Sequence, residues 1–222
     1  MYNLHLNAEQ LEIRETVRDF VLREINPVVL HPDRLQEFNP RFPLELLDKA
    51  SQMGLRTLAL SEEAGGAGAD CLTSCIVMEE LAAGDVDLAV ALAQTSALGR
   101  ALLGRLMSAE QRARFLKKFV DDDKYHLAFA GRDPDAGIGW SYHRPLAAED
   151  GGEPVAVKQG NGDWGINGAV SFVSNAPIAK LFAVQVRTDP RKTGMNGVST
   201  LLVPRDAPGL TVHAQGKAFS DS

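Results

Sequence analysis

The sequence has few features of a membrane-spanning, nucleic-acid-binding or secreted protein. Its 222 residues carry a net charge of −6 and no long basic run, which disfavours a nucleic-acid backbone as partner. No apolar stretch reaches the roughly 20 residues that span a bilayer. The first ten residues lack the basic and apolar regions of a signal peptide. We therefore expect a soluble, cytoplasmic protein with no membrane and no nucleic-acid partner.

Only two cysteines occur, Cys71 and Cys75, four residues apart in a helix-like segment. Such a stacked pair is poorly placed for a disulfide bond. No second pair of cysteines or histidines lies nearby to complete a zinc site. We expect no bound metal and two buried, structural thiols.

The first half of the chain has helical periodicity. Apolar residues recur every three to four positions between Ile13 and Ile25, which predicts an amphipathic helix over 8–26 with Asn7 as its N-cap. Residues 60–70 are a glycine-rich loop. The segment 86–106 is apolar around nearly its whole circumference, so we expect a central helix that is covered on all sides. Further helices are predicted over 43–53, which ends before Gly54, over 71–83, and over 108–123, where Ser108 and Gln111 have capping-box spacing.

After residue 125 the apolar period changes to two. Short segments rich in Val, Phe, Thr and Leu alternate with turn residues, which is typical of strands. They are HLAFA, EPVAVKQ, DWGINGAVSFVSN, KLFAVQVRT, VSTLLVPRD and GLTVHAQ. The pattern predicts an α+β protein: an N-terminal all-helical domain over 1–124, then a small, mostly antiparallel β domain over 125–222.

This order of elements, together with five local strings, resembles the N-terminal helical and middle β domains of the acyl-CoA dehydrogenase family. The resemblance covers essentially the whole chain. It implies FAD as cofactor and oxidation of the Cα–Cβ bond of an acyl-CoA thioester, in which a carboxylate removes the α-proton and the flavin takes the β-hydride. The strings are LNAEQLEIRETVRDFVLREINP, MGLRTLALSEEAGGAGAD, AFAGRDPDAGIG, WGINGAVSFVSNAPIAKLFAVQVRT and GVSTLLVPRDAPGLTV.

The resemblance makes residues 128–139, AFAGRDPDAGIG, the loop that holds the flavin. The family loop usually reads Thr-Glu-Pro, then Gly-Ser-Asp. Arg132 replaces the threonine whose hydroxyl meets the flavin: its guanidinium would either favour the anionic reduced ring or fill the space that the ring needs. Ile138 replaces the serine near the phosphate and the substrate thioester, so it is also a substrate candidate. The cofactor-binding candidates in this loop are Phe129, Ala130, Gly131, Arg132, Gly137 and Ile138.

A second flavin element of the family, Trp-Ile-Thr-Asn, corresponds here to FVSN. The resemblance assigns Phe172 as the stacking ring and Ser174 as the hydroxyl, with Val173 between them. Alternatively, Phe172 is a core residue of a strand.

Polar residues also interrupt the apolar helix at 94–96. In the family this helix borders the acyl pocket, which makes Gln94 a substrate candidate. The alternative is that these side chains bond to their own helix backbone. His126 and His143 bracket the glycine-rich loop and are within reach of a phosphate, although isolated histidines near loops are usually solvated.

The chain ends before the C-terminal helical bundle that carries the family's glutamate base and most of its oligomer contacts, so no catalytic residue is assigned. Three functions stay open: a portion of an acyl-CoA dehydrogenase whose base comes from a missing segment or partner chain, a non-catalytic partner subunit of a complete enzyme, or a flavin-dependent monooxygenase of the same fold. The expected partners are an acyl-CoA, a homo- or hetero-oligomer, and an electron-accepting flavoprotein or oxygen.

Overall fold

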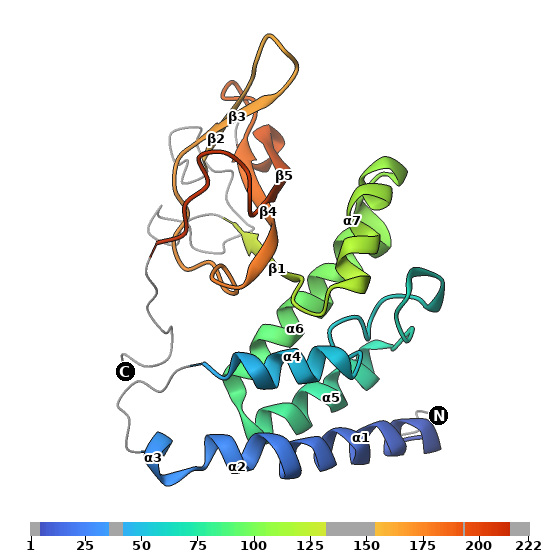
Figure 1. Cartoon of the computed structure of the whole chain (residues 1–222). Coiled ribbons are helices and arrows are strands. Elements are labelled where there is room, and N and C mark those ends of the chain that lie inside the picture. Colours follow the sequence, from blue (N-terminus) through green and yellow to red (C-terminus); the bar gives the residue numbers. More distant parts are fainter. Residues whose placement is uncertain (1–4, 36–41, 132–153, 193, 214–222) are drawn as a thin grey trace. The chain divides into compact units, whose positions relative to one another are not determined.

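The structure is a computed structural model of the 222-residue chain and describes residues 5–35, 42–131, 154–192 and 194–213. The chain divides into two compact units, Met1–His126 and Leu127–Ser222 (Figure 1). The first unit is helical and the second is built on a β-sheet. The α+β class is therefore confirmed.

The N-terminal helix begins where its cap predicts. α1 (Ala8–Phe20) follows Asn7, whose Oδ1 accepts a hydrogen bond from the Gln10 backbone N at 2.8 Å. In return, the Asn7 backbone N donates to Gln10 Oε1 at 3.1 Å. This capping box satisfies backbone N–H groups that a first helical turn otherwise leaves without partners. The chain continues through the π-helical segment η1 (Val21–Ile25) and the short helices α2 (Asn26–Val29) and α3 (Pro32–Leu35).

The later helices of this unit also lie close to their predicted ranges. Gly54, just after the first of them, has a φ of +82°, the left-handed conformation that favours glycine at a helix end. Ser108 caps the last one as predicted, since its Oγ accepts from the Gln111 backbone N at 3.2 Å. The elements are α4 (Leu44–Gln52), the 3-10 helix η2 (Glu62–Ala64), α5 (Cys71–Gly84), α6 (Val86–Ala101), the π-helical segment η3 (Leu102–Leu106) and α7 (Ala109–Asp121).

α5 packs against both α1 and α6 (Figure 1). Gly84, the last residue of α5, allows this helix to approach η1 closely: a Cβ at Gly84 would lie 2.7 Å from Val21 Cγ1. The absence of a side chain at this position therefore sets the spacing of two helices. The core of the unit is aliphatic, and its fully buried members include Val17, Ile25, Leu47, Val77, Leu81, Leu88, Leu92 and Leu103.

A buried arginine closes the C-terminal end of α7. Arg56 is 1% exposed, and its guanidinium donates to the carbonyl oxygens of Phe119, Val120 (3.3 Å) and Tyr125 (3.4 Å). The guanidinium carbon also lies 4.6 Å from the centre of the Phe119 ring. Burial lowers the pKa of this guanidinium, and two nearby aspartates oppose the shift. The carbonyl groups at a helix end carry partial negative charge, so a cation is favoured there.

The helix over 86–106 is not covered on all sides, which corrects one prediction. It buries Leu88 and Leu92, whereas Val90 is exposed and Leu106 is 73% exposed. Among the described residues, Val86–Leu106 is the one helical stretch long and apolar enough to cross a membrane by length and composition. Half of its apolar window is buried inside the protein, and a core helix meets the same length and composition criterion.

The prediction of buried thiols was also wrong. Cys71 and Cys75 are both free and exposed. The first two turns of α5 bury Thr73, Ile76 and Val77, and the two cysteines, one helical turn apart, lie on the other side. Apolar residues are spread around the whole circumference of α5, so the sequence did not indicate which side would face solvent.

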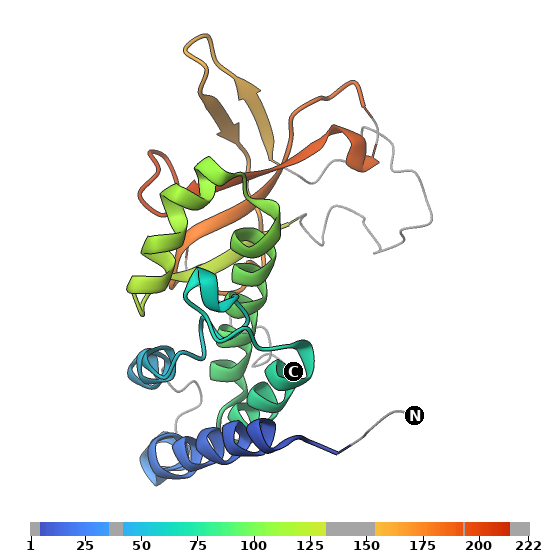
Figure 2. The same ribbon diagram turned by 90° about the vertical axis from the view of Figure 1, so that its right-hand side faces the viewer.

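The second unit contains one sheet. Its five described strands are β1 (His126–Ala130), β2 (Val155–Lys158), β3 (Trp164–Asn167), β4 (Ala179–Arg187) and β5 (Val198–Pro204), with the 3-10 helix η4 (Gly194–Gly197) before the last. The order is β1-β4-β2-β3, and β5 pairs with β4. β2 and β3 form an antiparallel hairpin (Figure 2), and β4 and β5 are antiparallel along seven paired residues. β2 pairs in parallel with β4, so the sheet is mixed rather than purely antiparallel.

Two predicted strands are shorter or absent. The segment 163–175 is a strand only as far as Asn167, because Gly168, Phe172 and Asn175 have φ values of +139°, +54° and +63°, which a strand does not tolerate. Within GLTVHAQ, the described residues 209–213 form no strand. The first two of these residues belong to a turn closed by a bond from Leu210 N to Ala207 O, and Gly209 has a φ of +83°.

Candidate functional site

The candidate site is built around a small apolar cluster in the second unit. Its buried members are Ala128 of β1 and Ala179 and Phe182 of β4. Two residues of the connection between β3 and β4, Val173 and Ala176, pack half-buried against this cluster. The segment that contains the predicted flavin element is therefore attached to the sheet through its apolar side chains. The other half-buried members are Val184, Val203, Leu210 and Val212.

Hydrogen bonds fix the same segment next to β1. Asn175 has a left-handed backbone, and its carbonyl oxygen accepts from Ile178 N at 3.0 Å and from Ala179 N at 2.9 Å. Its side-chain Nδ2 donates to the carbonyl oxygen of Leu127 at 3.4 Å. β1 carries Leu127 and ends one residue before Gly131. The structure thus places the second predicted flavin segment beside the start of β1, the strand that leads into the first.

Within the segment, alternate side chains face in opposite directions. Phe172 is 75% exposed and Ser174 is exposed, whereas Val173 between them packs on the cluster. The interpretation of Phe172 as a core strand residue is therefore wrong. An aromatic ring and a hydroxyl are presented to solvent from one short turn, and Val173 contributes packing rather than a free side chain.

The end of β1 offers a second set of predicted residues. Phe129 is 44% exposed and Ala130 is buried, so Ala130 can offer a ligand only its backbone. At Gly131 a Cβ would lie 3.0 Å from Phe129 Cε1 and 3.7 Å from Gln185 Oε1. The backbone at Gly131 is therefore close to two side chains and leaves little room for one of its own.

The remaining predicted residues are not joined to this site. Arg132, Gly137 and Ile138 lie outside the described residues. Gln94 is half-buried on α6, in the helical unit. Its neighbour Thr95 is buried and pairs through Oγ1 with His126 Nδ1 at 3.3 Å, so Thr95 contacts more than its own helix backbone. His126 is itself buried, which corrects the expectation of a solvated histidine.

Sequence reasoning missed two residues that hold the turn, Asn175 and Arg205. Arg205 donates through Nη1 to the Ala176 carbonyl oxygen at 2.7 Å. The order Asn-Ala-Pro at 175–177 was an available signal, because asparagine tolerates a left-handed backbone and often precedes a turn. Arg205 gave no local signal, since it lies 29 residues from its partner.

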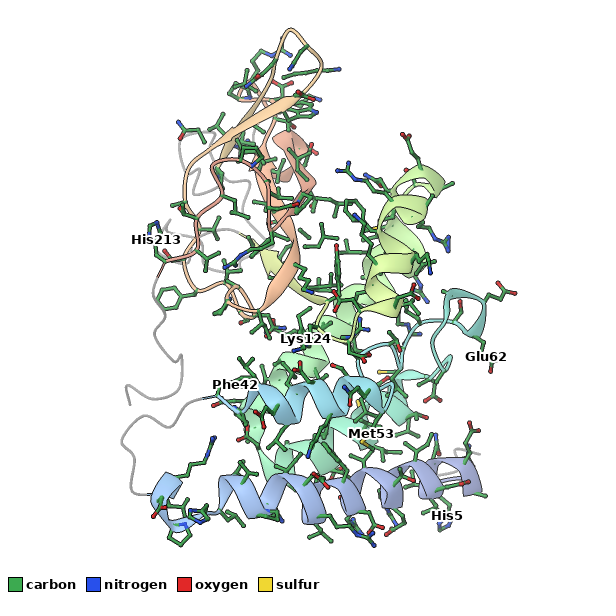
Figure 3. All side chains as sticks on the ribbon, in the orientation of Figure 1. His5, Phe42, Met53, Glu62, Lys124 and His213 are labelled. Atoms are coloured by element: carbon green, nitrogen blue, oxygen red, sulfur yellow. The ribbon has the colours of Figure 1, made fainter. Side chains whose placement is uncertain are left out.

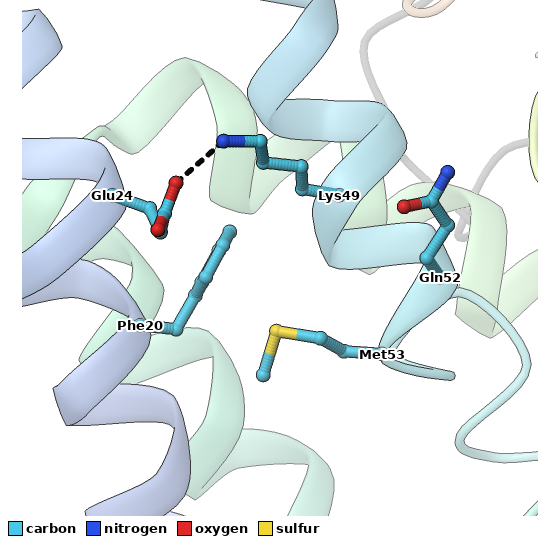
Figure 4. A pocket seen from close by; sticks show the side chains of 5 residues that line it. All are labelled: Phe20, Glu24, Lys49, Gln52 and Met53. Carbon is cyan, nitrogen blue, oxygen red and sulfur yellow. Dashed lines mark hydrogen bonds and ion pairs between the residues drawn. The ribbon is translucent and has the colours of Figure 1, made fainter.

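A pocket of about 340 Å³ lies in the helical unit, between α4 and the α1–η1 helix (Figure 4). Lys49 and Glu24 form an ion pair at its edge. Gln52, the last residue of α4, and Met53, the residue after it (also labelled in Figure 3), line the pocket as well. Phe20 closes the remaining side. The charges there neutralise each other, and none of the predicted flavin or substrate residues lines this pocket.

Two family models match the chain, and their order follows the order of the two units. The model described as acyl-CoA dehydrogenase, N-terminal domain, matches residues 7–123. The model described as acyl-CoA dehydrogenase, middle domain, matches residues 150–220. This chain belongs to the acyl-CoA dehydrogenase family.

Individual relatives and solved structures show the extent of the similarity. A probable acyl-CoA dehydrogenase of Bacillus subtilis, YngJ, is 29% identical over 210 residues, which cover 95% of this chain and 51% of YngJ. The butyryl-CoA dehydrogenase structure from Megasphaera elsdenii has a TM-score of 0.77 at 24% identity and is matched over 94% of this chain and 51% of its own. A structure of PigA with FAD and proline has a TM-score of 0.75 at 25% identity, over 96% and 52%. The chain thus spans about half the length of the relatives that it matches.

Proposed function

We propose that this chain forms the helical and middle β parts of a flavoprotein acyl-CoA dehydrogenase, which introduces an α,β double bond into an acyl-CoA thioester. The observation that carries the proposal is the turn that presents Phe172 and Ser174 to solvent beside β1. Family membership supports the same assignment. The acyl-CoA, the partner chain, the electron-accepting flavoprotein or oxygen, and the cytoplasmic location are parts of this proposal.

The described residues of this turn suit FAD. A flat, largely apolar isoalloxazine ring with a polar edge needs an aromatic or apolar face and nearby hydrogen-bond donors. Phe172 has an exposed ring, and Ser174 has an exposed hydroxyl two residues away. FAD supplies the hydride-accepting centre of such an enzyme when it is bound.

The chain's own residues then have separate tasks. Phe172 would pack on the ring, Ser174 would donate a hydrogen bond to its polar edge, and the backbone at Gly131, just after β1, would offer a further N–H group. Ring and donor together would exclude water from one side of the reacting centre. In this proposal, the carboxylate base that removes the α-proton lies in a further segment or a partner chain.

The first test is a visible absorption spectrum of the purified chain after incubation with FAD and removal of free FAD. We expect a retained flavin band, weaker in Ser174→Ala and unchanged in Ser171→Ala, whose serine is also exposed but lies outside the proposed contact. A short-chain acyl-CoA is then added without oxygen, and loss of the band identifies dehydrogenation and a base present in the sample.

Two results would contradict the proposal. A protein that stays colourless with FAD, even with its co-purifying partner, would be a non-catalytic subunit. A flavin band that ignores acyl-CoA, in a protein that consumes oxygen with another substrate, would indicate a monooxygenase.

A further inference from the structure

The turn with Phe172 and Ser174 has an unfavourable backbone. Phe172 and Asn175 are the non-glycine residues with positive φ among those that the structure describes, and they lie three positions apart in this one turn. A left-handed conformation costs free energy for any residue with a Cβ, and most for a bulky one such as phenylalanine. Residues of this kind persist only where the surrounding structure imposes them, and they concentrate at functional sites.

The apolar contacts of the turn hold it only in part. Val173 and Ala176 are half-buried rather than buried, and the Asn175 side-chain bond to Leu127 is long, at 3.4 Å. Phe172 and Ser174 are exposed and contribute little packing. Backbone hydrogen bonds also hold the turn, from Ala176 N to Val173 O at 3.2 Å and from Ile178 N to Asn175 O at 3.0 Å, and they leave the Ala176 carbonyl oxygen for a side-chain donor.

Arg205 supplies that donor from another part of the sheet. It directly follows β5, and its backbone N donates to the Lys180 carbonyl oxygen at 3.0 Å, which fixes its position beside the start of β4. Its guanidinium Nη1 donates to the Ala176 carbonyl oxygen at 2.7 Å. The same guanidinium lies 6.0 Å from the centre of the Phe182 ring, in the apolar cluster on which the turn packs.

The Arg205 bond is the shorter of the two side-chain hydrogen bonds described for this turn, and its donor is charged. A hydrogen bond from a charged donor is shorter and stronger than a neutral one, as the 2.7 Å distance shows beside the 3.4 Å of the Asn175 bond. Because the backbone of Arg205 is itself bonded beside β4 and β5, the guanidinium holds the turn in a fixed position relative to these two strands. Its guanidinium points at a carbonyl oxygen of the turn and contacts neither Phe172 nor Ser174 among the interactions found in the described residues.

We propose that Arg205 is a positioning residue: by holding the Ala176 carbonyl, it keeps the 172–176 turn in the conformation that presents Phe172 and Ser174. The effect of Arg205 on flavin binding rests on the proposed function. The effect of Arg205 on the conformation of the turn does not rest on it, because the turn can be probed without any ligand.

The first experiment is limited proteolysis of the FAD-free chain with chymotrypsin, with cleavage after Phe172 followed by mass spectrometry. Arg205→Met removes the donors and keeps an unbranched side chain, whereas Arg205→Lys restores a charged donor. Arg191→Met is the matched control, since Arg191 is an exposed arginine of the same unit that pairs with Asp189 and not with the turn.

We expect cleavage after Phe172 to be at least fivefold faster in Arg205→Met, close to wild type in Arg205→Lys, and unchanged in Arg191→Met. The midpoint of urea unfolding should be the same in all four proteins, because Arg205 is exposed. Equal cleavage rates in wild type and Arg205→Met would overturn the proposal. Faster cleavage would also overturn the proposal if the unfolding midpoint of Arg205→Met were lowered and Arg205→Lys did not restore it. That combination is the result of general destabilisation.

A second experiment separates the turn from the cofactor. Titration with FAD should give a dissociation constant about tenfold higher for Arg205→Met than for wild type, with Arg205→Lys in between. If no protein binds FAD but Arg205→Met is still cleaved faster, the positioning role is supported and the proposed function fails. If all proteins bind FAD equally and cleavage rates are equal, the proposed function stands and the positioning role is overturned.

Discussion

The left-handed backbone at Phe172 predicts that replacing this phenylalanine by asparagine stabilises the protein. Complete burial of a phenylalanine contributes up to about 3 kcal/mol, and Phe172 is 75% exposed, so its loss costs only about 0.7 kcal/mol. A left-handed residue with a bulky side chain costs about 1 to 2 kcal/mol, which asparagine largely avoids. The net change expected for Phe172→Asn is a gain of roughly 0.5 to 1 kcal/mol in unfolding free energy.

Phe129→Asn is the matched control because it makes the same chemical change at a strand position. Phe129 is 44% exposed in β1 and has no positive φ. The change therefore loses about 1.6 kcal/mol of burial, and asparagine adds up to about 1 kcal/mol through its poor strand propensity. The two variants should differ by about 3 kcal/mol in unfolding free energy and have opposite signs.

Urea unfolding followed by tryptophan fluorescence is the suitable assay. Both tryptophans, Trp140 and Trp164, belong to the second unit, so the signal reports the part of the chain that carries both substitutions. The midpoint should rise for Phe172→Asn and fall for Phe129→Asn at unchanged slope. A loss of stability in Phe172→Asn as large as in Phe129→Asn would refute the reasoning, because no backbone strain would then be present at position 172.

Other predictions concern the helical unit. Arg56→Met should lower the unfolding free energy by about 3 to 5 kcal/mol, measured by urea unfolding followed by far-ultraviolet circular dichroism, because three carbonyl groups lose a buried charged donor; a loss under about 1 kcal/mol would contradict it. The Thr73 backbone N–H lowers the pKa of the Asp70 carboxyl below its usual 3.8. That carboxylate therefore stabilises the fold above pH 4, and the difference in Tm between wild type and Asp70→Ala should shrink as the pH falls through the lowered pKa. A thiol reagent should label both Cys71 and Cys75 in the native protein, Cys75 more slowly, because desolvation and the adjacent Cys71 thiol raise the pKa of Cys75; labelling only after unfolding would contradict their exposure.

Features with a local cause were predictable from the sequence. Asn7 with Gln10, and Ser108 with Gln111, form capping boxes because both partners lie within one helical turn. Gly54 ends α4 for an equally local reason. These signals need no knowledge of the rest of the fold.

Features with a distant cause were not predictable. Arg56 bonds to residues more than 60 positions away, and nothing next to it in the sequence indicates a buried arginine. The strand predicted over 163–175 failed because Val and Phe favour strands individually, while Asn175 and the sheet impose a turn. Resemblance to the family identified Phe172 and Ser174, but only the structure separates their exposed side chains from the packed Val173.

The π-helical segment η1 has a consequence for insertions and deletions. A π-helical turn contains one residue more than an α-helical turn, so it shifts the facing of every later residue by about 100°. Deleting one residue within Val21–Ile25 would restore an ordinary helix and leave Val29 facing the core, whereas ordinary α-helical geometry with all residues kept would rotate Val29 away and turn the exposed Val28 or Leu30 toward the core. This helix should therefore tolerate a one-residue deletion within Val21–Ile25, whereas a deletion outside this segment would turn a different set of side chains toward the same core.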